Sequence, residues 1–232
     1  MSAADAGSRP HVVVHVAVSV DGATTGFAPD VARFYELART WHEDATLTGA
    51  DTILAQEAAL AAQPGPGPAD DGPLLAVVDS RHRVRAWQAL RDAGHWSAVV
   101  ALRSAAGPVR ADGGATSSGD GADAAHADAA VRDAAAVEEL VLGDDRVDLA
   151  AAIGALGERG ARVVRVDSGG SLTGALLHAG LVDEISLLVH PCLADPGGGR
   201  RWYGTEPPPP SALRLTGAEA FDDGAVWLRY RC

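Results

Sequence analysis

The sequence predicts an α/β fold with a mostly parallel central sheet, helices on both faces and antiparallel strands at its C-terminal end. Short Val-rich runs alternate with helical patterns along most of the 232 residues, and such alternation favours a parallel sheet. Residues 212–232 instead contain two strand-like runs on either side of Asp223-Gly224, which is a common hairpin turn. Hydrophobic residues make up 47% of the chain, enough to bury a sizeable core.

The strands are predicted from short aliphatic runs that are bounded by glycine or aspartate. The first, "HVVVHVAVSV", stops at Asp21-Gly22. The runs before the C-terminal hairpin cover residues 11–20, 44–49, 74–80, 97–102, 137–143, 161–167 and 181–190.

The helices are predicted from apolar residues at helical spacing. Asp30 is placed to cap the first helix, and Gly180 ends the last one. The expected helices cover residues 31–40, 50–62, 86–92, 148–160 and 170–180. The buried face of the last helix is predicted to consist of Leu172, Ala175, Leu176 and Ala179.

We predict one domain over residues 11–232, preceded by a flexible tail over residues 1–10, because no repeat and no linker separates two cores. Residues 104–136 are mostly Ala, Gly, Asp and Ser with scattered charge. This composition buries little apolar surface, so the segment is expected to be a mobile insert.

Charge and cysteine content restrict the partners and the compartment. The net charge of −12 disfavours nucleic acid and anionic membranes as partners. Cys192 and Cys232 form no Cys-x-x-Cys pair, which favours a reducing compartment without zinc or a disulfide framework. No signal peptide and no apolar run of membrane-spanning length is visible, so we expect a cytoplasmic protein. His11 and His15 lack a third ligand, and we expect them to pack or to line the site rather than bind metal.

Residues 167–170, Asp-Ser-Gly-Gly, spell the nucleophile segment of trypsin-like serine proteases. That site needs an antiparallel barrel and a histidine and an aspartate brought from elsewhere. Here the four residues lie between a Val-rich strand and an amphipathic helix, so we set the protease interpretation aside. In this position Gly169 and Gly170 allow a phosphate to approach the unpaired N–H groups of the helix start. The alternative is that the glycines only permit a tight turn.

Two further strand ends carry residues that suit a phosphate-rich cofactor. Gly49 and Thr52 follow one strand, and Arg81 and Arg83 follow Asp79-Ser80 at the end of another. Ligands of parallel α/β sheets lie over the carboxyl ends of the strands. An arginine there suits a ribose 2′-phosphate, which favours NADP over NAD. Solvated surface arginines are the alternative.

Four stretches together resemble the riboflavin-biosynthesis reductases: "AVSVDGATTG", "DATLTGADTILA", "LLAVVDSRHRV" and "VDSGGSLTGALLHAGLVDEISLLVHPCL". The resemblance covers most of residues 11–195. It implies a dihydrofolate-reductase-like fold and the NADPH-dependent reduction of the ribosyl group of a pyrimidine ribosylamine 5′-phosphate to ribityl. Family members usually form homodimers. The deaminase half of the bifunctional bacterial members needs His-x-Glu and Cys-x-x-Cys, which this sequence lacks.

The resemblance also implies roles for residues on the cofactor side. Gly49 and Thr52 would hold cofactor phosphates, and Ser80 and Arg83 would lie near the adenosine ribose and its 2′-phosphate. The pyrophosphate would meet the start of the last helix at Gly169, Gly170, Ser171 and Leu172.

On the substrate side the resemblance implies three further residues. Asp21 would lie beside the substrate for orientation or acid catalysis, Arg33 would bind its phosphate, and Asp167 would replace a family glutamate that faces it. The alternatives are a turn residue for Asp21, a helix N-cap for Asp167 and a solvated helical charge for Arg33.

The sequence departs from the family next to the second motif. Gln56 and Glu57 stand where the family often has Asp-Asp-Pro-x-Leu-Thr and a basic residue. The cofactor side therefore matches better than the substrate side. A reductase of the same fold with another small substrate, such as a pterin-like or other carbonyl or imine compound, is the main alternative. A nucleotide-binding module without catalysis is a further one.

Overall fold

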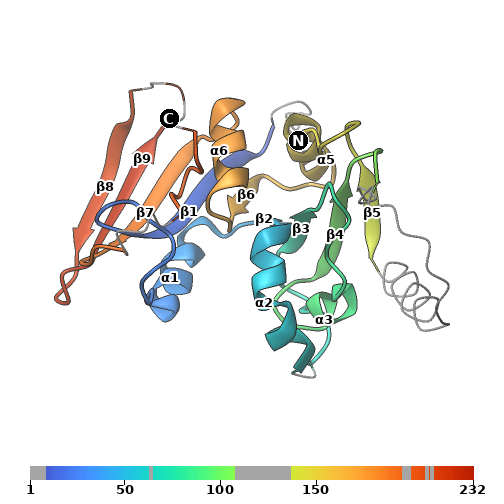
Figure 1. Cartoon of the computed structure of the whole chain (residues 1–232), viewed down its shortest axis with the longest axis horizontal. Coiled ribbons are helices and arrows are strands. Elements are labelled where there is room, and N and C mark those ends of the chain that lie inside the picture. Colours follow the sequence, from blue (N-terminus) through green and yellow to red (C-terminus); the bar gives the residue numbers. More distant parts are fainter. Residues whose placement is uncertain (1–8, 63–64, 108–136, 195–199, 207–208, 210–211) are drawn as a thin grey trace, which may run out of the picture. The chain divides into compact units, whose positions relative to one another are not determined.

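The computed structural model consists of two compact units (Figure 1). Unit 1 comprises Met1–Thr48 and Leu149–Cys232, and unit 2 comprises Gly49–Asp148. The structure describes residues 9–62, 65–107, 137–194, 200–206, 209 and 212–232. The predicted tail and insert lie almost wholly outside the described residues. The single domain predicted over residues 11–232 stays a prediction.

Unit 1 contains a sheet with the strand order β2-β6-β1-β7-β9-β8. The first four of these strands are parallel, and the last two are antiparallel to their neighbours. The strands are β1 (His11–Ser19), β2 (Ala45–Gly49), β6 (Val163–Val166), β7 (Glu184–His190), β8 (Arg214–Ala220) and β9 (Val226–Arg231). The helices are α1 (Val31–Ala38), the 3-10 helix η1 (Arg39–Trp41), α5 (Leu149–Glu158) and α6 (Ser171–His178). The predicted parallel strands and the C-terminal hairpin are confirmed.

Both faces of the unit 1 sheet are covered, as predicted. His15 on β1 faces α1, where its ring stacks on Phe34 with the centroids 4.2 Å apart. The alternate residues of β1 point to the opposite face and are also buried: Val12, Val14, Val16 and Val18. The crossovers from β1 to β2 and from β6 to β7 run in opposite directions along the sheet, so the right-handed rule puts α1 and α6 on opposite faces.

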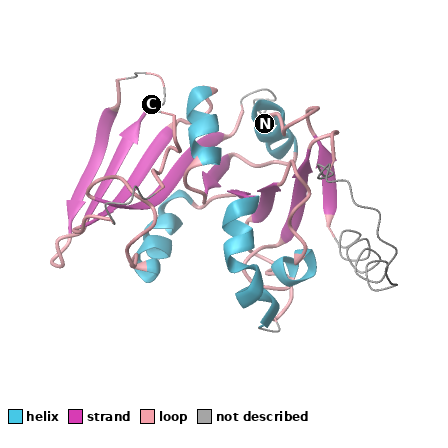
Figure 2. Ribbon diagram, viewed as in Figure 1, coloured by secondary structure: helices cyan, strands magenta, loops and turns pink. Residues whose placement is uncertain are grey.

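Unit 2 contains three parallel strands among its described residues, in the order β5-β4-β3. They are β3 (Leu74–Val78), β4 (Ala98–Arg103) and β5 (Glu138–Val141), with the helices α2 (Ala50–Ala62) and α3 (Trp87–Arg91) (Figure 2). Both helices pack on one face of β3 and β4. The buried residues of this core are Ala50, Ile53, Leu75, Val77, Val84, Trp87, Leu90, Val99 and Ala101.

The predicted first helix is confirmed, including its cap: the Asp30 carboxylate accepts a hydrogen bond from the Arg33 N–H at 3.0 Å. The predicted buried face of α6 is partly wrong, because Ala175 and Ala179 are exposed. Its buried residues are Leu172, Thr173, Gly174 and Leu176.

No helix among the described residues is long and apolar enough to cross a membrane. Those residues also include no group of three His, Cys, Asp or Glu side chains placed to hold a metal ion. Cys192 and Cys232 are both free cysteines.

His15 joins α1 to the sheet through a buried chain of hydrogen bonds. Its Nε2 lies 3.0 Å from the carbonyl oxygen of Phe34, so Nε2 carries the proton and donates. Its Nδ1 therefore accepts from the Ser186 hydroxyl at 2.9 Å, and Trp227 Nε1 donates to the same hydroxyl oxygen at 2.8 Å. Burial, opposed by the Phe34 carbonyl and assisted by Arg165, lowers the pKa of His15 to about 4.

This buried neutral histidine makes the stability of the protein depend on pH. The unfolded chain binds the His15 proton near pH 6.5, whereas the folded protein binds it only near pH 4. We therefore expect the His15 contribution to the free energy of unfolding to fall by about 3 kcal/mol as the pH drops through this range, with no change above it. Urea unfolding at several pH values measures the slope.

The His15→Gln variant should lose this part of the slope, whereas His95→Asn, which changes an exposed histidine, should keep it. An unchanged slope in His15→Gln would show that His15 does not titrate in this way.

Candidate functional site

Asp21 and Asp167 follow neighbouring parallel strands of unit 1. β1 and β6 pair in register from His11 opposite Val163. Asp21 lies two residues beyond the end of β1, and Asp167 lies one residue beyond the end of β6. Both carboxylates thus belong to the carboxyl edge of the sheet, where parallel α/β proteins bind their ligands.

The Asp21 carboxylate is anchored as an anion. Its Oδ1 accepts hydrogen bonds from the Ser19 hydroxyl at 2.6 Å and from the Ala194 N–H at 3.0 Å. These two donors, with a smaller contribution from Arg201, lower the pKa of the exposed Asp21 carboxyl. A carboxyl group that is ionised at neutral pH is a poor proton donor. The geometry thus favours an orienting role for Asp21 over acid catalysis.

Asp167 forms an ion pair with a buried arginine, Arg165. Its Oδ2 lies 3.2 Å from Arg165 Nη1 and accepts a hydrogen bond of 3.4 Å from the Tyr35 hydroxyl. Arg165 also contacts the Glu43 carboxylate at 2.8 Å. Although burial acts in the opposite direction, Asp167 and Glu43 raise the pKa of Arg165. The alternative interpretation of Asp167 as a helix N-cap is wrong, because Gly170 occupies that position.

Arg33 is paired rather than solvated. Its Nη1 donates to Asp223 Oδ2 at 2.7 Å, and its Nε lies 3.5 Å from Asp30 Oδ2. The guanidinium also lies 4.5 Å from the centre of the Phe221 ring. The alternative of a solvated helical charge is therefore wrong. A substrate phosphate at Arg33 would have to share this cation with Asp223.

The start of α6 is covered by residues 200–204 of the same chain, which we call the strap. The Gly170 N–H donates to the Trp202 carbonyl oxygen at 2.9 Å, so this amide is already engaged. Gly170 has a φ of +68°, and a Cβ there would lie 2.9 Å from Arg200 Cδ. These contacts support the interpretation that Gly170 permits a tight turn. Among the described residues, no acceptor lies on the N–H groups of Ser171 and Leu172, which remain the candidate donors to a pyrophosphate.

The strap also explains why Gly174 is buried in α6. A Cβ on Gly174 would lie 2.3 Å from the carbonyl oxygen of Tyr203. We expect Gly174→Ala to lower the free energy of unfolding by about 1–3 kcal/mol because the main chain of the strap has to move. Urea unfolding measures the change.

Gly154 in α5 supplies a matched control, because a Cβ there would meet nothing within 4 Å. Gly154→Ala should be neutral or stabilising by up to about 1 kcal/mol, since alanine favours helix over glycine. Equal effects of the two substitutions would contradict the packing of the strap on Gly174.

In unit 2, the predicted cofactor residues lie in two places. Gly49 and Thr52 lie at the end of β2 and in the first turn of α2. Ser80 and Arg83 lie in the loop after β3. The Ser80 hydroxyl oxygen accepts a hydrogen bond from the Val147 N–H at 3.0 Å, so part of its capacity is used inside the protein.

The Arg83 guanidinium is partly exposed and pairs with Asp51, with Nη2 2.7 Å from Oδ1. Because both side chains of this pair are exposed, the contact agrees equally with the alternative of a solvated surface arginine. A partly exposed guanidinium after a parallel strand still has the chemistry to receive a 2′-phosphate, so the residues present fit an NADP-type cofactor.

Glu57 has a structural role that its position in the sequence did not reveal. Its Oε1 accepts hydrogen bonds from the N–H groups of Arg85 at 2.8 Å and Ala86 at 2.7 Å, at the start of α3. Arg165 was also missed as a site residue, although its place two residues before Asp167 in a strand puts both side chains on one face. No local pattern in the sequence indicated that the strap would cover the start of α6.

A solved structure of a pyrimidine reductase-like protein from Corynebacterium diphtheriae shares this fold with a TM-score of 0.68 and 16% identity. The alignment covers 96% of this chain and 91% of that chain. The fold is the dihydrofolate-reductase-like fold of reductase domains. Residues 10–227 match the family model described as the RibD C-terminal domain. The chain therefore belongs to the RibD C-terminal domain family, which confirms the resemblance found in the sequence.

Two curated relatives carry the same name, 2,5-diamino-6-ribosylamino-4(3H)-pyrimidinone 5′-phosphate reductase. The protein from Methanothermobacter thermautotrophicus is 28% identical over 95% of this chain and 90% of its own length. The protein from Archaeoglobus fulgidus is 29% identical over 83% of this chain and 84% of its own length. The predicted class, a reductase of the riboflavin-biosynthesis type with a nicotinamide cofactor, is confirmed.

Proposed function

We propose that this protein reduces the ribosyl group of 2,5-diamino-6-ribosylamino-4(3H)-pyrimidinone 5′-phosphate to ribityl, with NADPH as the reductant. The observation that carries the proposal is that nearly the whole chain aligns with a reductase of this name, over 95% of the chain in one case. The anchored carboxylate of Asp21 at the end of β1 is consistent with it.

The reaction is a two-electron reduction of the anomeric carbon. When bound, NADPH supplies the hydride. The bond between the anomeric carbon and the ring oxygen breaks. The carbon receives the hydride and becomes a CH₂ group, and the ring oxygen takes up a proton and becomes a hydroxyl. Because its pKa is lowered by Ser19 and Ala194, Asp21 acts as an anion that accepts hydrogen bonds from substrate hydroxyl or amino groups.

The remaining residues bind and orient in this proposal. Arg33 binds the 5′-phosphate, Asp167 faces the substrate, and Gly169, Gly170, Ser171 and Leu172 form the pyrophosphate site. In unit 2, Gly49 and Thr52 contact cofactor phosphates, and Ser80 and Arg83 contact the adenosine ribose and its 2′-phosphate. The engaged Gly170 amide leaves Ser171 and Leu172 as the donors that support this assignment.

A specific observation favours a second candidate, an NADPH reductase with another small substrate. Glu57 stands in the segment where the family resemblance expects a substrate-side motif, yet its carboxylate is committed to the start of α3. Asp167 is shorter than the family glutamate and is held by Arg165. Both differences concern the substrate rather than the cofactor.

The assay is NADPH oxidation, followed at 340 nm, with the diaminopyrimidinone ribosylamine phosphate as substrate. We expect turnover with formation of the ribityl product. NADPH binding without turnover would favour the second candidate, and no binding of NADPH or NADH would contradict both.

We further propose a cytoplasmic homodimer without nucleic-acid partners. The net charge of −12 and the family resemblance support this proposal. Light scattering after gel filtration measures the oligomeric state, and a monomeric mass would contradict the dimer.

A further inference from the structure

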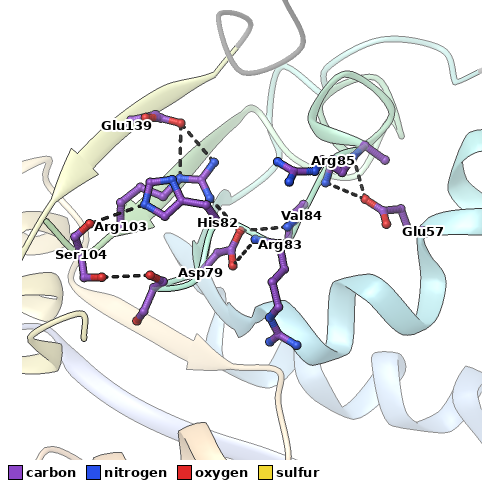
Figure 3. A network of polar contacts seen from close by, with 11 residues as sticks. Glu57, Asp79, His82, Arg83, Val84, Arg85, Arg103, Ser104 and Glu139 are labelled. Carbon is purple, nitrogen blue, oxygen red and sulfur yellow. Dashed lines mark hydrogen bonds and ion pairs between the residues drawn. The ribbon is translucent and has the colours of Figure 1, made fainter. Parts of the chain in front are cut away.

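The loop that follows β3 in unit 2 is shaped by a buried carboxylate, Asp79 (Figure 3). Asp79 Oδ1 accepts a hydrogen bond from the Arg83 N–H at 2.9 Å, and Oδ2 accepts one from the Val84 N–H at 2.9 Å. The Asp79 carbonyl also accepts from the His82 N–H at 3.1 Å. This one residue therefore closes the backbone of residues 79–84 into a compact turn.

Arg103, the last residue of β4, holds that carboxylate in place. Its Nη1 donates to Asp79 Oδ2 at 2.7 Å, and the two side chains are 3% and 0% exposed. The other side of the guanidinium contacts Glu139 Oε1, at 3.1 Å from Nη2 and 3.3 Å from Nε. The guanidinium lies 5.0 Å from the centre of the Trp87 ring. Packing and charge thus fix Arg103 on all these sides, and Figure 3 shows it between Asp79 and Glu139.

A second set of contacts holds the first residues of the same loop. The Ser104 hydroxyl donates to the Ser80 carbonyl oxygen at 2.9 Å, and the Val147 N–H donates to the Ser80 hydroxyl oxygen at 3.0 Å. His82 adopts a φ of +53°, in the left-handed region that non-glycine residues rarely occupy. The loop is therefore held in one conformation from β4 and from residue 147.

This arrangement leaves the Arg83 side chain partly exposed at the surface of the loop. Its amide is fixed by Asp79, whereas its side chain is 42% exposed and its guanidinium pairs with Asp51. A buried ion pair adds little net stability compared with packed apolar residues. Here the Asp79 carboxylate of the pair also accepts hydrogen bonds from the amides of Arg83 and Val84. The main effect of the ion pair is therefore on the position of this loop.

We propose that Asp79 and Arg103 are positioning residues that set the preference for NADPH over NADH. They hold the turn so that Arg83 meets the 2′-phosphate, and neither side chain touches the cofactor. The inference rests on the proposed function, and specifically on the assignment of Arg83 to the 2′-phosphate.

Dissociation constants for NADPH and NADH, from quenching of tryptophan fluorescence, test the proposal in Asp79→Asn, Arg103→Met and Arg103→Lys. In the first two variants we expect the ratio of NADH to NADPH dissociation constants to fall about tenfold, because a binding group displaced by about 1 Å loses most of its benefit. Arg103→Lys keeps the charge and should recover part of the ratio. Calorimetric titration with 2′-AMP and 5′-AMP should show the same loss for 2′-AMP alone.

Ser104→Ala keeps the test decisive if the buried variants do not fold, because it removes only the bond to the Ser80 carbonyl. A smaller fall in the ratio, of about threefold, is expected. Arg91→Met is the matched control, because Arg91 pairs with Asp92 at 3.0 Å outside the loop. It should leave the ratio unchanged.

Equal losses of NADPH and NADH affinity, or an unchanged ratio in every folded variant, would overturn the positioning role while leaving the reductase function intact. A wild-type protein that binds both cofactors equally would overturn both the positioning role and the proposed preference for NADPH.

Discussion

Replacing Asp21 with asparagine is expected to lower kcat about 100-fold and to leave the dissociation constant for NADPH nearly unchanged. Asparagine keeps the shape of the side chain and an acceptor for the Ser19 hydroxyl and the Ala194 N–H. It removes the negative charge that orients the substrate in the proposed reaction. The measurement is the steady-state rate of NADPH oxidation, together with a separate binding titration.

The pH profile separates the anionic role from acid catalysis. The Ser19 and Ala194 donors lower the pKa of Asp21 below 3.8. If the ionised form is required, this group limits activity only below about pH 4. A loss of kcat as Asp21 ionises with rising pH would instead identify it as the proton donor.

Asp92 supplies a matched control for Asp21. Arg91 and Gln88 lower the pKa of this half-buried carboxyl as well, but Asp92 lies in unit 2 after α3 and outside the proposed site. Asp92→Asn should keep full activity. If Asp21→Asn were as active as Asp92→Asn, the substrate-side assignment of Asp21 would fail.

Replacing Arg83 with glutamine is expected to raise the dissociation constant for NADPH about 30-fold, which corresponds to about 2 kcal/mol for a lost charge-assisted hydrogen bond. The constant for NADH should change little, because NADH lacks the 2′-phosphate. Loss of the Asp51 partner contact costs little, since exposed ion pairs contribute at most about 1 kcal/mol.

Salt provides an independent check on Arg83. The wild-type affinity for NADPH should weaken with ionic strength more steeply than that for NADH, and Arg83→Gln should remove most of the difference. Arg91→Gln should behave like the wild type. Equal effects of Arg83→Gln on both cofactors would refute the 2′-phosphate assignment.

Local patterns in the sequence predicted most of the elements. The Val-rich run of β1, the Asp30 cap and the Asp223-Gly224 turn are signals within a few residues, and the structure confirms each of them. In α6, the burial of Gly174, which the apolar periodicity did not indicate, has a non-local cause. Gly174 is buried because the strap lies on it, and helical periodicity in α6 contains no information about a segment some 30 residues later.

The same distinction applies to the candidate site. The sequence drew attention to Asp21, Arg33 and Asp167, but it did not reveal the partners that set their chemistry. Arg33 pairs with a residue 190 positions away, and the donors to Asp21 include an amide 173 positions away. Only the fold brings such groups together. This is why the sequence left acid catalysis open for Asp21, whereas the geometry favours an anion.

The most direct measurement is a turnover with NADPH that carries deuterium at both C4 positions of the nicotinamide, followed by mass spectrometry of the product from the diaminopyrimidinone ribosylamine phosphate. We expect a ribityl product with a single deuterium, located on the carbon that was anomeric in the substrate. A ribityl product without deuterium, or no reduction of this substrate while NADPH is bound, would contradict it.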